Sequence, residues 1–150
     1  MSTTNPSLAT TEQAELILHL YELRTEETMR KARHWFAFEF WPTSADDFFA
    51  VMNDFASPHN AYFRQVHSYW EMAAAFVLHG ALSADLFFDT NGENLFLMSK
   101  LVPFIQEIRA KNAGIFAKTQ KLVDADPVIQ QRLASMVERN KATAAAASKA

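Results

Sequence analysis

The fold is decided by residues 62–80, which read YFRQVHSYWEMAAAFVLHG. When this stretch is wound as an α-helix, its apolar side chains cover an arc wider than half of the helix circumference. A helix with so little polar surface has to be enclosed by other helices, so the stretch predicts the central buried helix of a bundle. The apolar side chains are Phe63, Val66, Tyr69, Trp70, Ala73, Phe76 and Val77.

The rest of the composition also favours an all-α fold. The 150 residues include only three Gly and five Pro, and they lack the turn density and β-branched runs of a sandwich or barrel. The length is that of one ordinary domain. We therefore expect a compact bundle of about five to seven helices. One long N-terminal helix should run from Thr10 or Thr11 to about Phe40, and the central helix should run from about Asn60 to His79.

Several residues mark the ends of further helices. Ser44 and Asp126 are typical N-caps, Gly80 is typical of the left-handed residue after a helix, and Pro103 should kink or split a helix predicted over residues 93–111. The last helix should end near Asn140. We expect residues 1–10 to be disordered, residues 11–140 to form a single helical domain, and residues 141–150 to form a flexible tail.

The charge is distributed unevenly along the chain. The net charge is −3, but residues 1–99 carry −8 and residues 100–150 carry +5. The basic residues of the C-terminal third form no run of three, which argues against nucleic-acid binding. Attraction between the acidic and basic parts, within one chain or between subunits, explains the asymmetry better. The absence of Cys fits a reducing compartment, and no segment resembles a signal peptide or membrane span, so we expect a cytoplasmic protein without a membrane role.

The polar stripe of the central helix is the best candidate site. His67 and Glu71 lie four residues apart and can pair on the helix surface. The structural interpretation, which we favour, is that Glu71 is ionised and held by Arg64 or His67. In the alternative interpretation, the stripe binds a small molecule or supplies an acid and a base. The stripe consists of Arg64, His67, Ser68, Glu71 and His79.

Residues 35–41, immediately before Pro42, form an aromatic run. Five aromatic residues fall within residues 35–41. On a helix their rings point around most of the circumference, so the segment either lies in the core, which is favoured, or presents an interface to a partner. The candidate interface residues are Trp35, Phe36, Phe38, Phe40 and Trp41.

The chain contains no complete motif for a metal or cofactor. Helical bundles that hold two irons use Glu-x-x-His pairs, which this sequence lacks. It also has no Gly-rich phosphate loop and no Gly-x-Ser-x-Gly elbow. We therefore expect no metal and no cofactor.

The central helix resembles a group of small bacterial helical proteins assigned to a domain of unknown function. The resemblance is centred on residues 60–86. It rests on Tyr69-Trp70-Glu71, Ala73-Ala74, His79-Gly80-Ala81-Leu82 and Asp85-Leu86. Many such proteins carry a membrane helix ahead of this region, which this sequence does not show. The resemblance implies a shared helical unit and no catalytic residues.

These observations predict a protein–protein interaction module or accessory subunit without catalytic activity, with a protein partner or a homo-oligomer. The alternative is a small-molecule-binding protein or enzyme with its site at the stripe of Arg64, His67 and Glu71. A concave pocket around Glu71 would favour the alternative, whereas an exposed aromatic patch would favour the interaction module.

Overall fold

The computed structural model describes residues 8–149, and in this part of the chain all regular secondary structure is helical, without strands. It contains nine α-helices, more than the five to seven expected. A π-helical turn, Trp35–Glu39, follows α2, and a 3-10 turn, Val102–Phe104, separates α6 from α7. The helices are α1 (Thr11–Arg24), α2 (Glu27–His34), α3 (Ala45–Asn53), α4 (Pro58–Leu78), α5 (Ala84–Thr90), α6 (Glu93–Ser99), α7 (Ile105–Lys111), α8 (Ala117–Asp124) and α9 (Pro127–Ala147).

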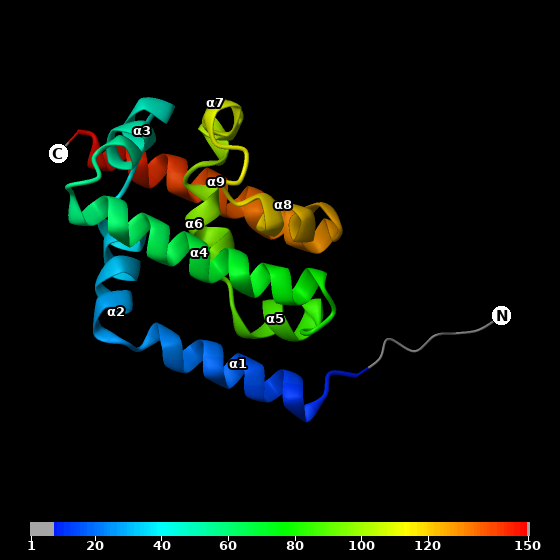
Figure 1. Ribbon diagram of the computed structural model, residues 1–150. Helices are drawn as coiled ribbons and strands as arrows, with labels where there is room; N and C mark the ends of the chain where they lie inside the picture. Colours follow the sequence, from blue (N-terminus) through cyan, green and yellow to red (C-terminus); the bar gives the residue numbers. More distant parts are fainter. Residues whose placement is uncertain (1–7, 150) are drawn as a thin grey trace.

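The prediction of one long N-terminal helix is wrong, because the helix is interrupted between α1 and α2. The carboxylate of Glu26 accepts hydrogen bonds from the backbone N–H groups of Thr28 at 3.0 Å and Met29 at 2.9 Å. Glu26 therefore caps α2 instead of lying inside a continuous helix. The break lets α2 turn away from α1, which runs along one edge of the molecule (Figure 1).

The other predicted boundaries agree better with the structure. Ser44 and Asp126 cap α3 and α9, each with a side-chain oxygen that accepts a backbone N–H, at 3.3 and 2.9 Å. Gly80 follows α4 with a φ of 80°, a left-handed conformation that favours glycine. Pro103 splits the helix predicted over residues 93–111 into α6 and α7.

The C-terminal helix extends further than the sequence indicates. It ends at Ala147, beyond the predicted end near Asn140, because the alanine-rich residues continue the helix on the surface. The expected disorder of residues 1–10 falls mainly on residues 1–7, which lie outside the described residues. The flexibility of the tail stays a prediction.

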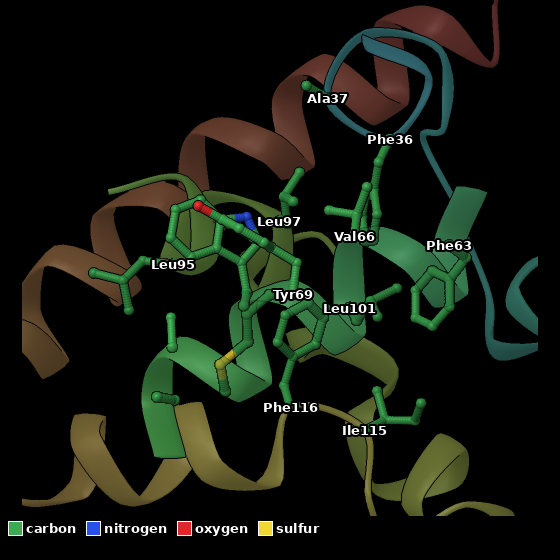
Figure 2. Packing of buried hydrophobic residues seen from close by; sticks show 14 of the residues in the cluster. Phe36, Ala37, Phe63, Val66, Tyr69, Leu95, Leu97, Leu101, Ile115 and Phe116 are labelled. Atoms are coloured by element: carbon green, nitrogen blue, oxygen red, sulfur yellow. The ribbon is translucent and has the colours of Figure 1, made fainter. Parts of the chain in front are cut away.

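Helix α4 forms the centre of the bundle, as predicted. It contacts α2, α3 and α8, and it crosses the middle of the molecule in Figure 1. Figure 2 shows α4 side chains packed among residues from the π-helical turn, α6 and the segment before α8; the labelled ones include Phe36, Phe63, Val66, Tyr69, Leu95, Leu97 and Phe116. In the described part of the chain, no helix combines the length and apolarity needed to cross a bilayer.

Candidate functional site

Glu71, the carboxylate of the predicted stripe, binds the N-terminus of α8. It is 6% exposed, and its two oxygens accept hydrogen bonds from the backbone N–H of Lys118 at 2.8 Å and of Thr119 at 3.0 Å. The Thr119 hydroxyl donates a third, at 2.7 Å. Because the residue before α8 is Phe116, which cannot cap a helix, Glu71 performs the capping from another helix.

His67 lies beside Glu71 and holds the same segment. Its Nε2 accepts a hydrogen bond from the backbone N–H of Phe116 at 2.9 Å. Phe116 is fully buried with a φ of 50°, a left-handed conformation that is unfavourable for an aromatic residue. Arg109 supports the same residues, since its Nε donates to the carbonyl oxygen of Ile115 at 2.9 Å. Together these contacts fix the strained turn that begins α8.

The prediction that Arg64 or His67 holds the Glu71 carboxylate is wrong. The Arg64 Nε donates to the side chain of Asn60 at 2.9 Å, and Arg64 forms no ion pair within the described residues. His67 uses its Nε2 for Phe116 and likewise forms no ion pair with Glu71. His79 is exposed at the end of α4.

Three stripe residues do share one surface. His67, Ser68 and Glu71 line a shallow depression of about 340 Å³ together with Lys118. The Ser68 hydroxyl donates to its own helix, to the carbonyl oxygen of Gln65 at 3.1 Å. The polar atoms of Glu71 and the Nε2 of His67 are already paired, so the depression offers few free groups to a ligand.

The pKa of His67 makes the anchoring of α8 dependent on pH. Burial lowers this pKa below 6.5; the Glu71 carboxylate opposes the shift and Lys118 adds to it. Since the unfolded chain takes up the proton near pH 6.5 and the folded chain resists it, stability is full above pH 6.5 and falls as the pH drops towards the folded-state pKa. Protonation of Nε2 would also remove the acceptor for the Phe116 N–H.

We therefore expect urea unfolding to show a lower stability at pH 5.5 than at pH 7.5. Replacing His67→Gln, which keeps an acceptor oxygen but cannot titrate, should reduce this difference. Parallel pH profiles for the two proteins would assign the pH dependence to other groups.

The aromatic run lies mainly in the core, which is the interpretation that the sequence favoured. Trp35, Phe36 and Phe40 are buried, so they are excluded as interface residues. Trp41 is half-buried. Phe38 alone among the five is exposed, at 68%.

Lys100, which the sequence analysis did not select, lies beneath the end of the run. It is 4% exposed, and its Nζ donates hydrogen bonds to the carbonyl oxygens of Phe36 at 2.6 Å, Ala37 at 2.7 Å and Phe40 at 3.0 Å. These carbonyls lie at the end of the π-helical turn, so Lys100 caps it from α6's C-terminus. The Nζ also lies 3.6 Å from the centre of the Trp41 ring.

The electrostatics of Lys100 are unusual. Burial lowers its pKa to about 7. The three carbonyl oxygens and the Trp41 ring act in the opposite direction because they stabilise the ammonium form. With a pKa of about 7, Lys100 carries its full positive charge below neutral pH and loses it above. A cleft of about 360 Å³ opens beside Lys100; we call it the Lys100 cleft. It is lined by Trp41, Pro42, Thr43, Ser99, Lys100, Pro103, Phe104, Val137, Asn140, Lys141, Ala144, Ala145 and Ser148.

A second feature, the α2–α9 groove, combines exposed apolar side chains with arginines. It consists of two depressions, of about 560 and 290 Å³, that share Met136. Phe38, Phe96 and Val128 add to its apolar surface. The charged and imidazole side chains along it are Arg30, Arg33, His34, Glu93, Arg132 and Arg139.

The charges of the α2–α9 groove are not balanced. Arg33 is neutralised by Glu93, which it binds through Nε at 2.9 Å and Nη2 at 2.6 Å. Glu93 raises the pKa of Arg33 through these hydrogen bonds. In contrast, Arg30, Arg132 and Arg139 form no ion pair within residues 8–149. The groove therefore carries an excess of positive charge beside an apolar surface.

No group of three or more His, Asp or Glu side chains among the described residues is arranged to hold a metal ion. The acid–imidazole pair of the stripe, His67 and Glu71, therefore has no third His, Asp or Glu side chain within residues 8–149 with which to hold a metal ion.

Comparison with known proteins identifies the family. A family model described as "Domain of unknown function (DUF4760)" matches residues 9–125, which extend from just before α1 to just after α8. No curated protein and no solved structure is significantly similar to the chain. The match includes residues 60–86, on which the resemblance was based, and it spans more than half of the chain. The chain therefore belongs to the DUF4760 family, a domain of unknown function.

Proposed function

We propose that this protein is a non-catalytic interaction module that self-associates through the α2–α9 groove. The observation that carries the proposal is the exposure of Phe38, at 68%, in a groove whose Arg30, Arg132 and Arg139 form no ion pair with the part of the chain that the structure describes. Apolar side chains surrounded by unpaired charge of one sign are typical of surfaces that bind a complementary protein segment.

Helix α1 has the complementary properties. Its outer face exposes Leu18 and Tyr21, at 62% and 58%, and carries Glu12, Glu15 and Glu22. Helical spacing places Leu18, Tyr21, Glu15 and Glu22 on one side. The α1 helix of a second copy would thus offer both apolar side chains and carboxylates to the groove, and it would bring residues of the acidic part of the sequence against Arg132 and Arg139 of the basic part.

A small-molecule or catalytic site at the stripe has less support. Glu71 already accepts hydrogen bonds from the backbone of α8, and His67 accepts one from Phe116 directly before α8. The depression beside them is also shallow. Catalysis by an acid and a base requires groups that are free to exchange a proton with a substrate.

The proposal predicts an assembly with a mass above the 17.0 kDa of the single chain. Phe38→Glu and Leu18→Glu should each shift sedimentation equilibrium towards the monomer, because each places a carboxylate in an apolar contact. A charge exchange tests the pairing: Arg132→Glu should weaken association, and adding Glu15→Arg should restore part of it. Rising salt should weaken the assembly.

Phe55→Glu is the matched control, because Phe55 is even more exposed, at 78%, but lies outside the α2–α9 groove. This variant should associate like the wild type. A wild-type protein that stays monomeric at high concentration would reject self-association. In that case, fluorescence anisotropy with a labelled peptide of residues 9–26 separates the explanations: binding that Phe38→Glu abolishes would leave the groove as a site for acidic helices of other proteins, and no binding would reject the groove altogether.

A further inference from the structure

In its protonated form, Lys100 is a buried cation without an anionic partner among residues 8–149. Its three N–H groups are taken by backbone carbonyls, and no carboxylate in the described part of the chain forms an ion pair with it. Buried charges in proteins are normally paired, because dipoles alone compensate little of the lost hydration. The interior beside Lys100 therefore has an unbalanced positive potential.

The Lys100 cleft lies against this charge and opens to solvent. Its volume, about 360 Å³, falls in the range of small-ligand sites. Its walls are mainly apolar, formed by Val137, Phe104 and Ala144 among others. Lys141 lies at the rim, and no Asp or Glu contributes to the lining. The site thus combines apolar walls with two positive charges and no negative one.

We infer that the Lys100 cleft binds a small organic monoanion, a carboxylate with a short apolar body. The carboxylate would bind Lys141 directly and balance the charge of Lys100 through space, while the apolar body would lie against Val137 and Phe104. Lys141 is available for this role. Its present partner, Glu138, lies 3.3 Å away on the surface, and both side chains are more than half exposed, so that ion pair is weak.

The geometry also defines what the ligand cannot be. The ligand carboxylate would accept no hydrogen bond from the Lys100 Nζ, because its three N–H groups are donated to backbone carbonyls. The attraction between the carboxylate and the Lys100 ammonium nevertheless persists at short range in an interior of low permittivity. A cationic ligand would be repelled by the same charges. A neutral ligand of equal size would gain only the apolar contacts.

Calorimetric titration of the full-length protein with octanoate, octanol and octylamine, below neutral pH where Lys100 is protonated, tests the inference. Octanoate should bind most tightly, octanol more weakly, and octylamine weakest. Lys141→Gln should weaken octanoate binding about fivefold and leave octanol binding unchanged. Lys121→Gln, which removes an exposed lysine of α8 outside the cleft, is the control and should bind octanoate like the wild type.

A second readout locates the site. Octanoate should shift the indole N–H signal of Trp41 in a nitrogen–proton NMR spectrum, and Ala144→Trp, which fills the cleft, should abolish the shift. Equal binding of octanoate and octanol would reject the anion requirement. Absence of binding by all three probes, or octanoate shifts that spare Trp41, would reject the site, and neither result bears on the α2–α9 groove.

Discussion

Replacing Glu71→Ala is expected to lower the free energy of unfolding by about 3 kcal/mol, since two backbone N–H groups of α8 and the Thr119 hydroxyl lose their acceptor. Glu71→Gln should cost about 2 kcal/mol, because one amide oxygen remains but its NH₂ group faces an N–H donor. Chemical denaturation measures both values. The loss should be greatest in α8, where hydrogen exchange should accelerate first.

Double-mutant cycles identify the partner of Glu71. Glu71→Gln and Thr119→Val should be strongly non-additive, because they remove two ends of one interaction. Glu71→Gln and Arg64→Ala should be additive within about 0.5 kcal/mol, since Arg64 binds Asn60 instead. A fully stable Glu71→Gln variant would contradict the capping role and would favour the alternative in which the stripe serves a ligand.

The sequence predicted those features of the fold that depend on local chemistry. The central helix follows from periodicity, and the ends marked by Ser44, Gly80 and Asp126 follow from capping preferences that act within one turn. The break after α1 was missed because Glu26 favours helix interiors and caps helices less often than Ser, Thr, Asp or Asn. Glu26 acts as a cap because α2 begins at Glu27, and the packing of α2 against α4 determines where that helix begins.

The candidate site was predicted only in part, because its contacts join residues that are far apart in the sequence. The stripe was located correctly, and Glu71 is indeed buried, but its partners lie 47 and 48 residues away along the chain. Arg64 and His67 were the only candidates within one or two turns, and local spacing favours such pairs. The sequence signal for the true partner is weak, because Asn112 is itself a favoured N-cap, for a helix that begins at residue 113. In the structure α8 begins only at Ala117, directly after Phe116, and its cap comes from Glu71.

Lys100 also left a signal in the sequence. It is the only charged residue within residues 94–106, a stretch rich in Leu, Phe and Met. A lone charge in an apolar stretch has to be satisfied inside the protein or reach the surface. Sequence alone does not distinguish these outcomes, because the carbonyls that accept its hydrogen bonds become available only when the π-helical turn forms more than 60 residues away.

Replacing Lys100→Met is expected to destabilise the protein by about 3 kcal/mol. Methionine fills a similar volume without a donor, so the carbonyl oxygens of Phe36, Ala37 and Phe40 lose their hydrogen bonds in a buried position. Removing a buried charge also removes its desolvation cost, which offsets part of the loss. The unsatisfied carbonyls should dominate here, because three acceptors depend on a single donor group.

Lys111→Met is the matched control for this change. The Lys111 Nζ also lies over an aromatic ring, 4.6 Å from the centre of Phe49, but the side chain is exposed and donates no hydrogen bond to a carbonyl oxygen of residues 8–149. Its loss should cost less than about 1 kcal/mol. Thermal and urea unfolding should therefore separate the two variants clearly, and tryptophan fluorescence should change only in Lys100→Met, since Trp41 lies against the Lys100 ammonium. If both variants unfold like the wild type, the end of the π-helical turn does not depend on the lysine, and the carbonyls must find other donors.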